Sequence, residues 1–322
     1  MQKPQIFIVG AGSIGRYLAA QLNPLAHVTL IARRDRGFTG SSEGARTLEI
    51  KWSKGENLPL VREEATLKSF DEIAQFPPES SVFIAPKAFD LKSALTQIAP
   101  RLAQDTHLVL CQNGLAIADE ARTQLAALNA PPVSISRAIF WLGVKPTNSG
   151  TLLVSGIPGG IEWASLPDSL KAPLTLQVIG LIEKSGIPVR LGSSIAQAEW
   201  NKALWNITLN ALCALAGAPN RAAADDPDLR PIAEQVLNEA LAVARAEGVR
   251  VSADCTEKIF EACRATGSNL NSTLQDLTAG RPTEIPWLNG AIVRLAAKNG
   301  IAVPINQALC QLIGYREKTR NY

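Results

Sequence analysis

A glycine-rich turn near the start of the chain constrains its fold more than any other feature. Residues 5–9 form a short apolar run rich in β-branched residues, and a helical pattern over residues 16–22 follows the turn. The turn itself reads Gly10-Ala11-Gly12-Ser13-Ile14-Gly15. The first glycine would permit a tight turn, the second would admit a pyrophosphate to the helix N-terminus, and the third would let the helix pack on the sheet. Such a turn can also be purely structural, but its context favours a dinucleotide site in a Rossmann-type domain.

The end of the second expected strand indicates which dinucleotide would bind. Residues 27–32 form another apolar run, and Arg33 and Arg34 follow it directly. An acidic residue here would bind the adenosine ribose of NAD, whereas a guanidinium binds a 2′-phosphate in a charge-assisted fork. We therefore expect NADP(H) as the cofactor, with Arg33 as the better candidate for the phosphate contact. A solvated turn is the alternative, and Asp35 comes too late to take the ribose role.

Two further strands should deliver polar side chains to the same edge of the sheet. Residues 81–85 form a buried-strand pattern that leads to Lys87, and residues 107–111 form another that leads to Asn113. Open α/β sheets bind ligands at the carboxyl ends of their strands, so Lys87 is expected to face the cofactor. Asn113 both donates and accepts, so it could hold the nicotinamide or a substrate oxygen. An ordinary Asn-Gly turn is the alternative for Asn113.

The pattern of elements changes part-way along the chain. Residues 131–137, 150–156 and 188–191 are expected strands, residues 174–185 an expected helix, and the Pro/Gly-rich stretches 146–150 and 156–160 expected loops. From residue 194 onward the patterns are helical, including 194–217, 228–247, 254–265 and 286–299. We therefore predict an α/β dinucleotide-binding domain at residues 1–193 and an all-α domain at residues 194–322.

Composition excludes several classes of protein. The chain has 322 residues, 46% of them hydrophobic and 19% charged, and its net charge of +3 is too small to indicate nucleic acid as a partner. It contains no apolar run of membrane-spanning length and no signal-peptide pattern, so we expect no membrane association. The five cysteines form no C-x-x-C pair. Free thiols in a cytoplasmic protein without a metal site are the expectation.

A polar stripe marks the expected helix at residues 194–217. At about 100° per residue, four polar side chains fall within an arc of roughly 80° that has apolar residues on both sides. They are Glu199, Lys202, Asn206 and Asn210. Buried lysine and asparagine side chains need partners or a ligand, because an unpaired buried polar group costs about 1–3 kcal/mol. The alternative is a narrow water-facing strip on a core helix.

Glu284 begins another informative stretch. It follows Thr283, a possible N-cap, and precedes Pro286 in the first turn of the expected helix at residues 286–299. A carboxylate at this point complements the helix dipole, so a purely structural role would account for it.

Together these motifs resemble those of the ketopantoate reductases (2-dehydropantoate 2-reductases), and the resemblance covers nearly the whole chain. The matching segments occur in the order found in that family: 10–15, 87–90, 112–114, 199–202 with Asn206 and Asn210, 272–276, 280–285 and 288–290. The helix that carries Lys202 and the segment 280–290 are its most specific parts.

The resemblance implies a Rossmann domain, an all-helical domain like that of 6-phosphogluconate dehydrogenase, and a cleft between them where NADPH reduces ketopantoate to pantoate. By motif position, Lys202 is the expected proton donor and Glu284 a further catalytic residue. Glu284, Lys87 and Asn113 are expected near the cofactor. The expected substrate-binding residues are Asn113, Lys202, Asn206, Asn210, Asn220 and Ser272.

The expected chemistry agrees with this assignment. Hydride delivery to a keto carbon develops negative charge on oxygen, which needs an acid or a cation beside it. The two histidines, His27 and His107, open strands at the edge opposite the expected cofactor. Lys202 is then the best available acid, and partial burial would lower its pKa towards the working range.

The chain departs from the family pattern at Ala211, at Pro286 and in the segment 140–145, which we interpret as a loop. These changes bear on the substrate more than on the reaction type. A related reductase of another 2-oxo acid or an imine therefore stays open, as does a non-catalytic NADP-binding sensor. Monomer and homodimer are both open as well.

Overall fold

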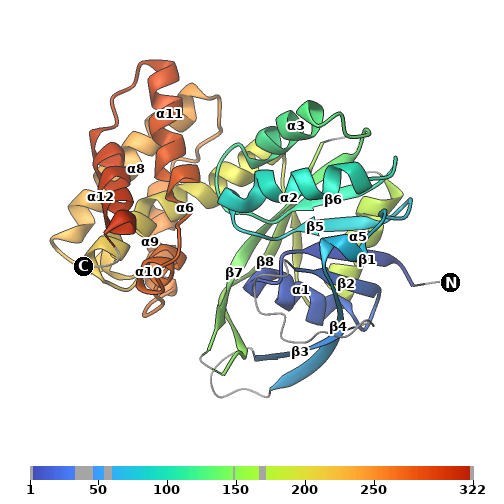
Figure 1. Cartoon of the computed structure of the whole chain (residues 1–322). Coiled ribbons are helices and arrows are strands. Elements are labelled where there is room, and N and C mark those ends of the chain that lie inside the picture. The colour runs from blue at the N-terminus through green and yellow to red at the C-terminus, as the bar shows by residue number, and fades with distance from the viewer. Residues whose placement is uncertain (1–2, 33–45, 54–59, 148, 167–171, 320–322) are drawn as a thin grey trace. The chain divides into compact units, whose positions relative to one another are not determined.

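The computed structural model describes residues 3–32, 46–53, 60–147, 149–166 and 172–319. The chain forms two compact units (Figure 1). The first contains Met1–Gln112 and Ile117–Ile195, and the second contains Ala196–Tyr322 together with the short segment Asn113–Ala116. The sequence did not indicate that this segment would group with the helical part.

The first unit alternates strands and helices. Its strands are β1 (Gln5–Val9), β2 (His27–Ile31), β3 (Arg46–Ser53), β4 (Val61–Lys68), β5 (Ser81–Ile84), β6 (His107–Leu110), β7 (Ser134–Pro146), β8 (Leu152–Ser165) and β9 (Val189–Leu191). Its α-helices are α1 (Ser13–Leu22), α2 (Leu91–Ile98), α3 (Ile117–Ala127) and α5 (Pro173–Lys184). Short 3-10 turns lie at Phe70–Glu72, Ala88–Asp90 and Ala99–Arg101.

These strands form one sheet in the order β3-β4-β2-β1-β5-β6-β7-β8-β9. The run from β4 to β7 is parallel, whereas β3 and β8 lie antiparallel to β4 and β7. A parallel contact between β3 and β8, at Trp52↔Leu152, curls the sheet on itself. From β1 the sheet grows outward through β2 and β4 on one side and through β5, β6 and β7 on the other, as in a doubly wound sheet. Ligands are expected where this order reverses, at the carboxyl ends of β1 and β5.

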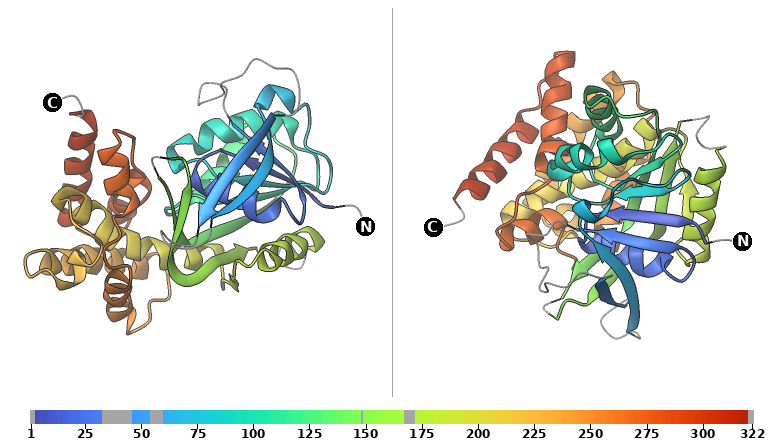
Figure 2. Two further views of the ribbon diagram at one scale, coloured as in Figure 1. Left: turned by 90° about the horizontal axis from the view of Figure 1, so that it is seen from below. Right: turned by 45° about the vertical axis from the view of Figure 1, so that its right-hand side comes forward.

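Helices cover both faces of this sheet. Figures 1 and 2 show α2 and α3 side by side on one face, with α1 and α5 on the other. Helix α1 packs against β1 and β2 through side chains that include Leu18 and Leu22, both fully buried. The predicted Rossmann-type α/β unit is therefore confirmed.

The strands β7 and β8 correct two predictions. The segment 140–145 lies within β7, and the predicted loop at residues 156–160 lies within β8. A bulge absorbs the extra residues, because Leu142 pairs with Gly156 while Phe140 pairs with Ile161. Gly160 has a φ of +57°, and a Cβ there would overlap the carbonyl oxygen of Pro188. The glycines thus allow a bulge and a close backbone approach within a continuing strand.

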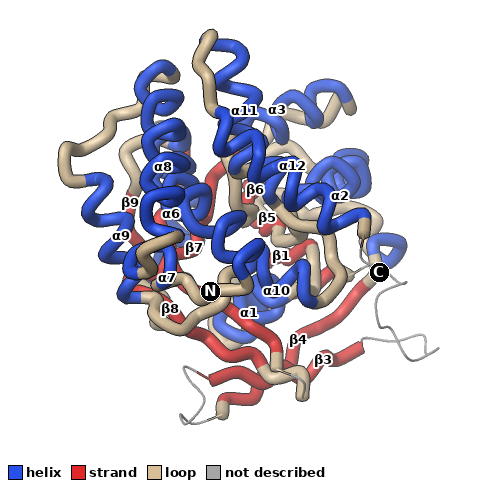
Figure 3. Tube along the Cα trace, turned by 90° about the vertical axis from the view of Figure 1, so that its left-hand side faces the viewer, coloured by secondary structure: helices blue, strands red, loops and turns tan. Residues whose placement is uncertain are grey.

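The second unit is helical, and its helices are drawn in blue in Figure 3. Its elements are α6 (Ile195–Ala216), α7 (Ala222–Asp225), α8 (Leu229–Ala246), α9 (Cys255–Ala265), α10 (Ser272–Thr278), the 3-10 turn Ile285–Trp287, α11 (Asn289–Asn299) and α12 (Pro304–Lys318). The predicted helices at 194–217, 228–247 and 254–265 are confirmed within two residues at each end. The one predicted from residue 286 begins at Asn289, because Ile285–Trp287 form a separate turn before it.

A hydrophobic core of its own holds the second unit together. Val236, Leu237 and Ala240 of α8 are fully buried against apolar residues of α6, α9 and α11. A buried polar network crosses this core: Asn289 donates to Asn306 (2.9 Å), and Asn306 donates to Glu239 (2.7 Å). Because Asn289 and Asn306 are both fully buried, the network fixes α8, α11 and α12 in one arrangement.

Within the described residues, no helix has the length and apolar character that a membrane crossing requires. The five cysteines are all free thiols, as predicted: Cys111, Cys213, Cys255, Cys263 and Cys310.

Candidate active site

The glycine turn of the first unit has the geometry of an anion-binding helix start. Gly10 has a φ of +102°, and a Cβ at Gly15 would overlap the Gly10 carbonyl oxygen, so α1 packs directly on the turn. Gly12 differs, because a Cβ there would meet no atom within 4 Å. It is also the N-cap of α1, with no side-chain cap bond and no acidic residue in the first turn. The free N–H groups and the open space in front of Gly12 fit a pyrophosphate.

Arg33 and Arg34 lie outside the described residues. The chain is described up to Ala32, whose N–H donates to the carbonyl of Lys68 (3.0 Å). The contact of Arg33 with a 2′-phosphate therefore stays a prediction.

A polar network ties the carboxyl ends of β5 and β6 to the first part of β7. The amide of Gln112 donates to the carbonyls of Ile84 (2.8 Å) and Pro86 (3.1 Å). Buried Arg137 of β7 donates to the carbonyls of Leu110 (2.7 Å) and Gln112 (2.6 Å). We did not single out Arg137 from the sequence, although an arginine inside an otherwise uncharged strand pattern is a signal that could have found it.

Lys87 follows β5 at this same edge. It precedes the 3-10 turn Ala88–Asp90, and Pro86 beside it packs against Gly10 closely enough that a Cβ on Gly10 would lie 2.8 Å from the Pro86 nitrogen. Lys87 thus leaves the strand next to the glycine turn.

The segment Asn113–Ala116 is held by three contacts within the second unit. Asn113 Nδ2 donates to Glu284 Oε2 (3.1 Å), the Leu115 N–H donates to the Trp287 carbonyl (3.0 Å), and the Ala116 N–H donates to Glu199 Oε2 (2.9 Å).

Gly114 lies between these contacts, with a φ of +116°. A Cβ there would lie 2.6 Å from the Trp287 Cβ. Asn113 and Gly114 therefore pack against Trp287 and Glu284, so they are not an isolated surface turn.

Helix α6 buries its polar stripe. Glu199, Lys202, Asn206 and Asn210 expose 5%, 9%, 5% and 2% of their surface. The water-facing strip, the alternative we weighed from the sequence, is therefore wrong.

Lys202 is the cation of this stripe. Its Nζ lies 4.1 Å from the centroid of the Trp205 ring, and burial lowers the pKa of Lys202 from 10.5 to about 7. A lysine with this pKa carries its proton in part of the population at neutral pH and releases it readily. Such a group can act as a general acid.

The asparagines of the stripe differ from other buried asparagines of the unit. Asn289 and Asn306 are bonded within the network described above, whereas the side chains of Asn206 and Asn210 make no hydrogen bond to any part of the chain that the structure describes. Buried amides without protein partners cost free energy unless a ligand or water satisfies them. Asn206 and Asn210 therefore offer hydrogen-bonding groups on the same face of α6 as Lys202, and their binding role stays a prediction.

Asn220 lies against the segment that leads into α10. Its N–H donates to the Asn269 carbonyl (2.9 Å) and its Nδ2 donates to Thr266 (3.2 Å). Its buried Oδ1 has no hydrogen-bond partner among the residues that the structure describes. Ser272 is the first residue of α10, directly after the N-cap Asn271.

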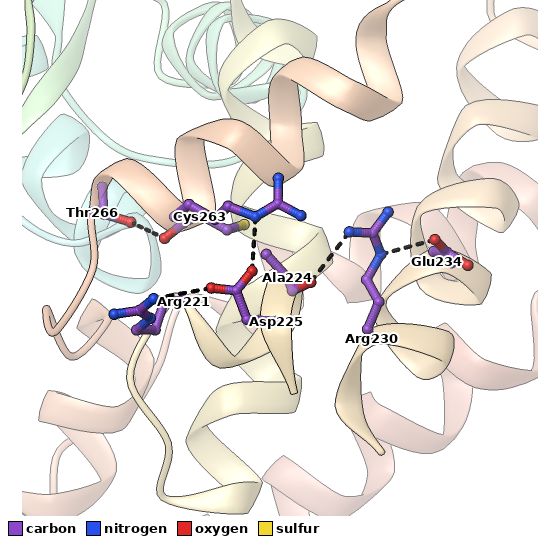
Figure 4. Close-up of polar contacts among 8 residues, drawn as sticks. Arg221, Ala224, Asp225, Arg230, Glu234, Cys263 and Thr266 are labelled. Carbon is purple, nitrogen blue, oxygen red and sulfur yellow. Dashed lines mark hydrogen bonds and ion pairs between the residues drawn. The ribbon is translucent and has the colours of Figure 1, made fainter. Parts of the chain in front are cut away.

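Figure 4 shows polar contacts around α7, the short helix that follows Asn220. Asp225 of α7 accepts from Arg264 of α9 (2.7 Å) and from Arg221 (3.2 Å), and Arg230 of α8 donates to the Ala224 carbonyl (3.3 Å). These contacts fix α7 between α8 and α9, so the turn before α7 is fixed as well.

Family models match both units. The model described as "Ketopantoate reductase PanE/ApbA" matches residues 6–168, and "Ketopantoate reductase PanE/ApbA C terminal" matches residues 194–317. The chain belongs to the ketopantoate reductase family. The resemblance found in the sequence is thereby confirmed, and with it the class of an oxidoreductase.

Individual members of the family match along the whole chain. The 2-dehydropantoate 2-reductase of Pyrobaculum aerophilum is 28% identical over 314 residues, which are 98% of each chain. A ketopantoate reductase structure from Ralstonia eutropha JMP134 has a TM-score of 0.80 and 26% identity, and the match covers 99% of this chain and 100% of that one. A D-mandelate dehydrogenase structure with NADH has the same TM-score at 20% identity, which shows a common fold alone.

The structure brings the predicted site residues together in three groups. Asn113 and Glu284 are bonded, Lys202, Asn206 and Asn210 share one buried face of α6, and Asn220 lies beside the chain before Ser272. Their catalytic and binding roles stay predictions.

Proposed function

We propose that this chain reduces ketopantoate (2-dehydropantoate) to (R)-pantoate with NADPH, as a step of pantothenate biosynthesis, and that Lys202 donates the proton. Family membership and the names of its full-length relatives support the substrate. The five free thiols support a cytoplasmic setting for the reaction.

The observation that carries the proposal is the environment of Lys202. A bound nicotinamide dinucleotide would supply the hydride to the keto carbon. The ammonium of Lys202 would then neutralise the charge that develops on the keto oxygen by giving up a proton. Since burial brings the pKa of Lys202 to about 7, this transfer is favourable near neutral pH.

Neutral amides suit the rest of the substrate. Asn206 and Asn210 lie on the face of α6 that carries Lys202, and both have hydrogen-bonding groups to offer. Asparagines can bind a carboxylate or a hydroxyl without adding a charge that competes with Lys202. We assign the same role to Asn113, Asn220 and Ser272, and a catalytic role beside Asn113 to Glu284.

The first unit supplies the residues that would hold the cofactor. The backbone of residues 10–15 would bind the pyrophosphate, with Gly12 admitting it to the N-terminus of α1. We assign the 2′-phosphate to Arg33, a place near the cofactor to Lys87, and contacts to both cofactor and substrate to Asn113. Glu284 completes the set of residues assigned to the cofactor.

A substrate panel tests the proposal. Purified protein with NADPH should reduce ketopantoate with a kcat/KM at least tenfold above that for other 2-oxo acids and for imines. If another compound of the panel were reduced more efficiently, the protein would still be a reductase, but ketopantoate would not be its substrate. NADPH binding without turnover on any member would favour the sensor alternative.

A further inference from the structure

The aromatic face of Trp205 is turned to the ammonium of Lys202. The Lys202 Nζ lies 4.1 Å from the ring centroid, inside the range of about 6 Å in which a cation is attracted by an aromatic ring. The two residues lie three positions apart on α6, which places them on neighbouring parts of one helix face.

Contacts with the rest of the second unit hold the indole in place. It packs on the hydrophobic core of the second unit and lies beside the thiol of Cys263 on α9, with which it interacts. A ring fixed between two helices keeps one orientation, so the cation above it has a fixed position too.

The site needs such a contact for an electrostatic reason. Burial disfavours the charged form of a lysine and can make it permanently neutral. A neutral amine at Lys202 could not donate the proton that the proposed reaction requires. An aromatic face stabilises an ammonium group without bringing a carboxylate, which would hold the proton too firmly and would repel an anionic substrate.

We propose that Trp205 is a positioning residue that holds Lys202 in its ammonium form, and aims it along the face of Asn206 and Asn210, through a cation–π contact. The inference rests on the proposed role of Lys202 as proton donor. The contact itself can be measured without substrate or cofactor.

The test replaces Trp205 by tryptophans with one, two and three ring fluorines, which weaken the negative potential of the ring face and leave its shape nearly unchanged. The pKa of Lys202 is read by NMR from lysine labelled with 13C at Cε, with Lys202→Met to assign the signal. We expect the pKa to fall with each fluorine, by about half a unit to one unit over the series. A flat or rising series would overturn the proposal.

Trp200 gives a matched control. It lies on α6, is buried, and has no cation–π contact within the described chain. The same analogues at Trp200 should leave the pKa of Lys202 unchanged. The other titratable groups named above are unchanged in both series: Glu199 one turn earlier on α6, Glu284, and the Cys263 thiol that interacts with the indole.

A conventional substitution gives a second, independent result. Trp205→Leu removes the ring, and a fall in the pKa of Lys202 would support the cation–π contact. A rise in that pKa would contradict it, because the indole would then have served to exclude water.

Turnover separates this inference from the proposed function. The falling limb of the kcat profile at high pH should move down by the same amount as the NMR value in each fluorinated protein. If the NMR series slopes but Lys202→Ala still turns over, the contact stands and the proton donor is another group. If the series is flat and Lys202→Ala is inactive, the donor stands and the role of Trp205 is refuted.

Discussion

The carboxamide of Asn113 donates to the carboxylate of Glu284 over a distance of 3.1 Å, although 171 positions separate the two in the sequence. Glu284 is buried and makes no side-chain cap bond to the 3-10 turn that follows it. The bond to Asn113 is a contact beyond the helix-dipole role that the sequence allowed, and that role stays an alternative.

We expect Glu284→Gln to lower kcat/KM for ketopantoate at least tenfold at an unchanged melting temperature. Glutamine keeps an acceptor for Asn113 but removes the charge, so the change tests the carboxylate itself. Steady-state kinetics and thermal unfolding measure the two effects. Glu317→Gln is the control, because Glu317 accepts from the neighbouring Thr283 N–H (2.7 Å) and should affect stability alone. Normal kinetics in Glu284→Gln would assign Glu284 a structural role.

The glycine turn gives a pair of opposite predictions. Gly15→Ala should destabilise the fold by about 1–3 kcal/mol, because its methyl group would overlap the Gly10 carbonyl and push α1 off β1. Gly12→Ala should leave stability within about 0.5 kcal/mol but weaken NADPH binding at least tenfold, because its methyl group would enter open space where the pyrophosphate is expected. Denaturant unfolding and fluorescence titration check both. Undiminished NADPH binding by Gly12→Ala would place the pyrophosphate elsewhere.

The choice of cofactor depends on Arg33. We predict that NADPH binds at least tenfold more tightly than NADH, the equivalent of about 1.4 kcal/mol from charge-assisted contacts to the 2′-phosphate. Arg33→Ala should remove most of this difference, and Arg34→Ala should have a smaller effect. Titrations with both nucleotides measure it. Equal affinities in the unmodified protein would refute the prediction.

The buried His107 makes stability depend on pH. Its Nε2 is 2.8 Å from the Ser136 hydroxyl, and burial lowers the pKa of His107 to about 4. In the unfolded chain a histidine titrates near 6.5, so below that pH the unfolded state binds the extra proton. Stability is therefore complete above about pH 6.5 and falls towards pH 4, by at most about 1.4 kcal/mol per pH unit from this residue.

His107→Gln should flatten that slope, as followed by denaturant unfolding between pH 4 and 7. The control is His27→Gln, since His27 is exposed at the start of β2 and the chain has no other histidine. An unchanged slope in His107→Gln would assign the pH dependence to other groups.

Local pattern was enough to predict much of this structure. The strand, glycine turn and helix at residues 5–22 are as expected, because Gly10 and Gly15 each have a local steric reason. The stripe on α6 is buried as the apolar residues beside it indicated.

Non-local contacts explain what the sequence could not reveal. The glycines and prolines of residues 156–160 look like a chain break, but pairing with β7 carries β8 through them. The grouping of Asn113–Ala116 with the helical unit depends on Glu199, Glu284 and Trp287, which lie far away in the chain. The apolar pattern beside the stripe did not reveal that the Trp205 ring contacts the Lys202 ammonium, and the indole also interacts with Cys263 of α9.

The role of Lys202 is the central claim, and Lys202→Ala tests it most directly. Single-turnover oxidation of bound NADPH by ketopantoate, followed across pH, should slow by about 10²–10⁴-fold, the usual contribution of a positioned general acid, while NADPH affinity changes little. Lys202→Arg should not restore the rate, because a guanidinium keeps its proton at any working pH. The unmodified protein should lose rate as the pH rises through the pKa of Lys202, near 7. Turnover by Lys202→Ala within about threefold of the unmodified protein would contradict the account, because a general acid contributes far more than that.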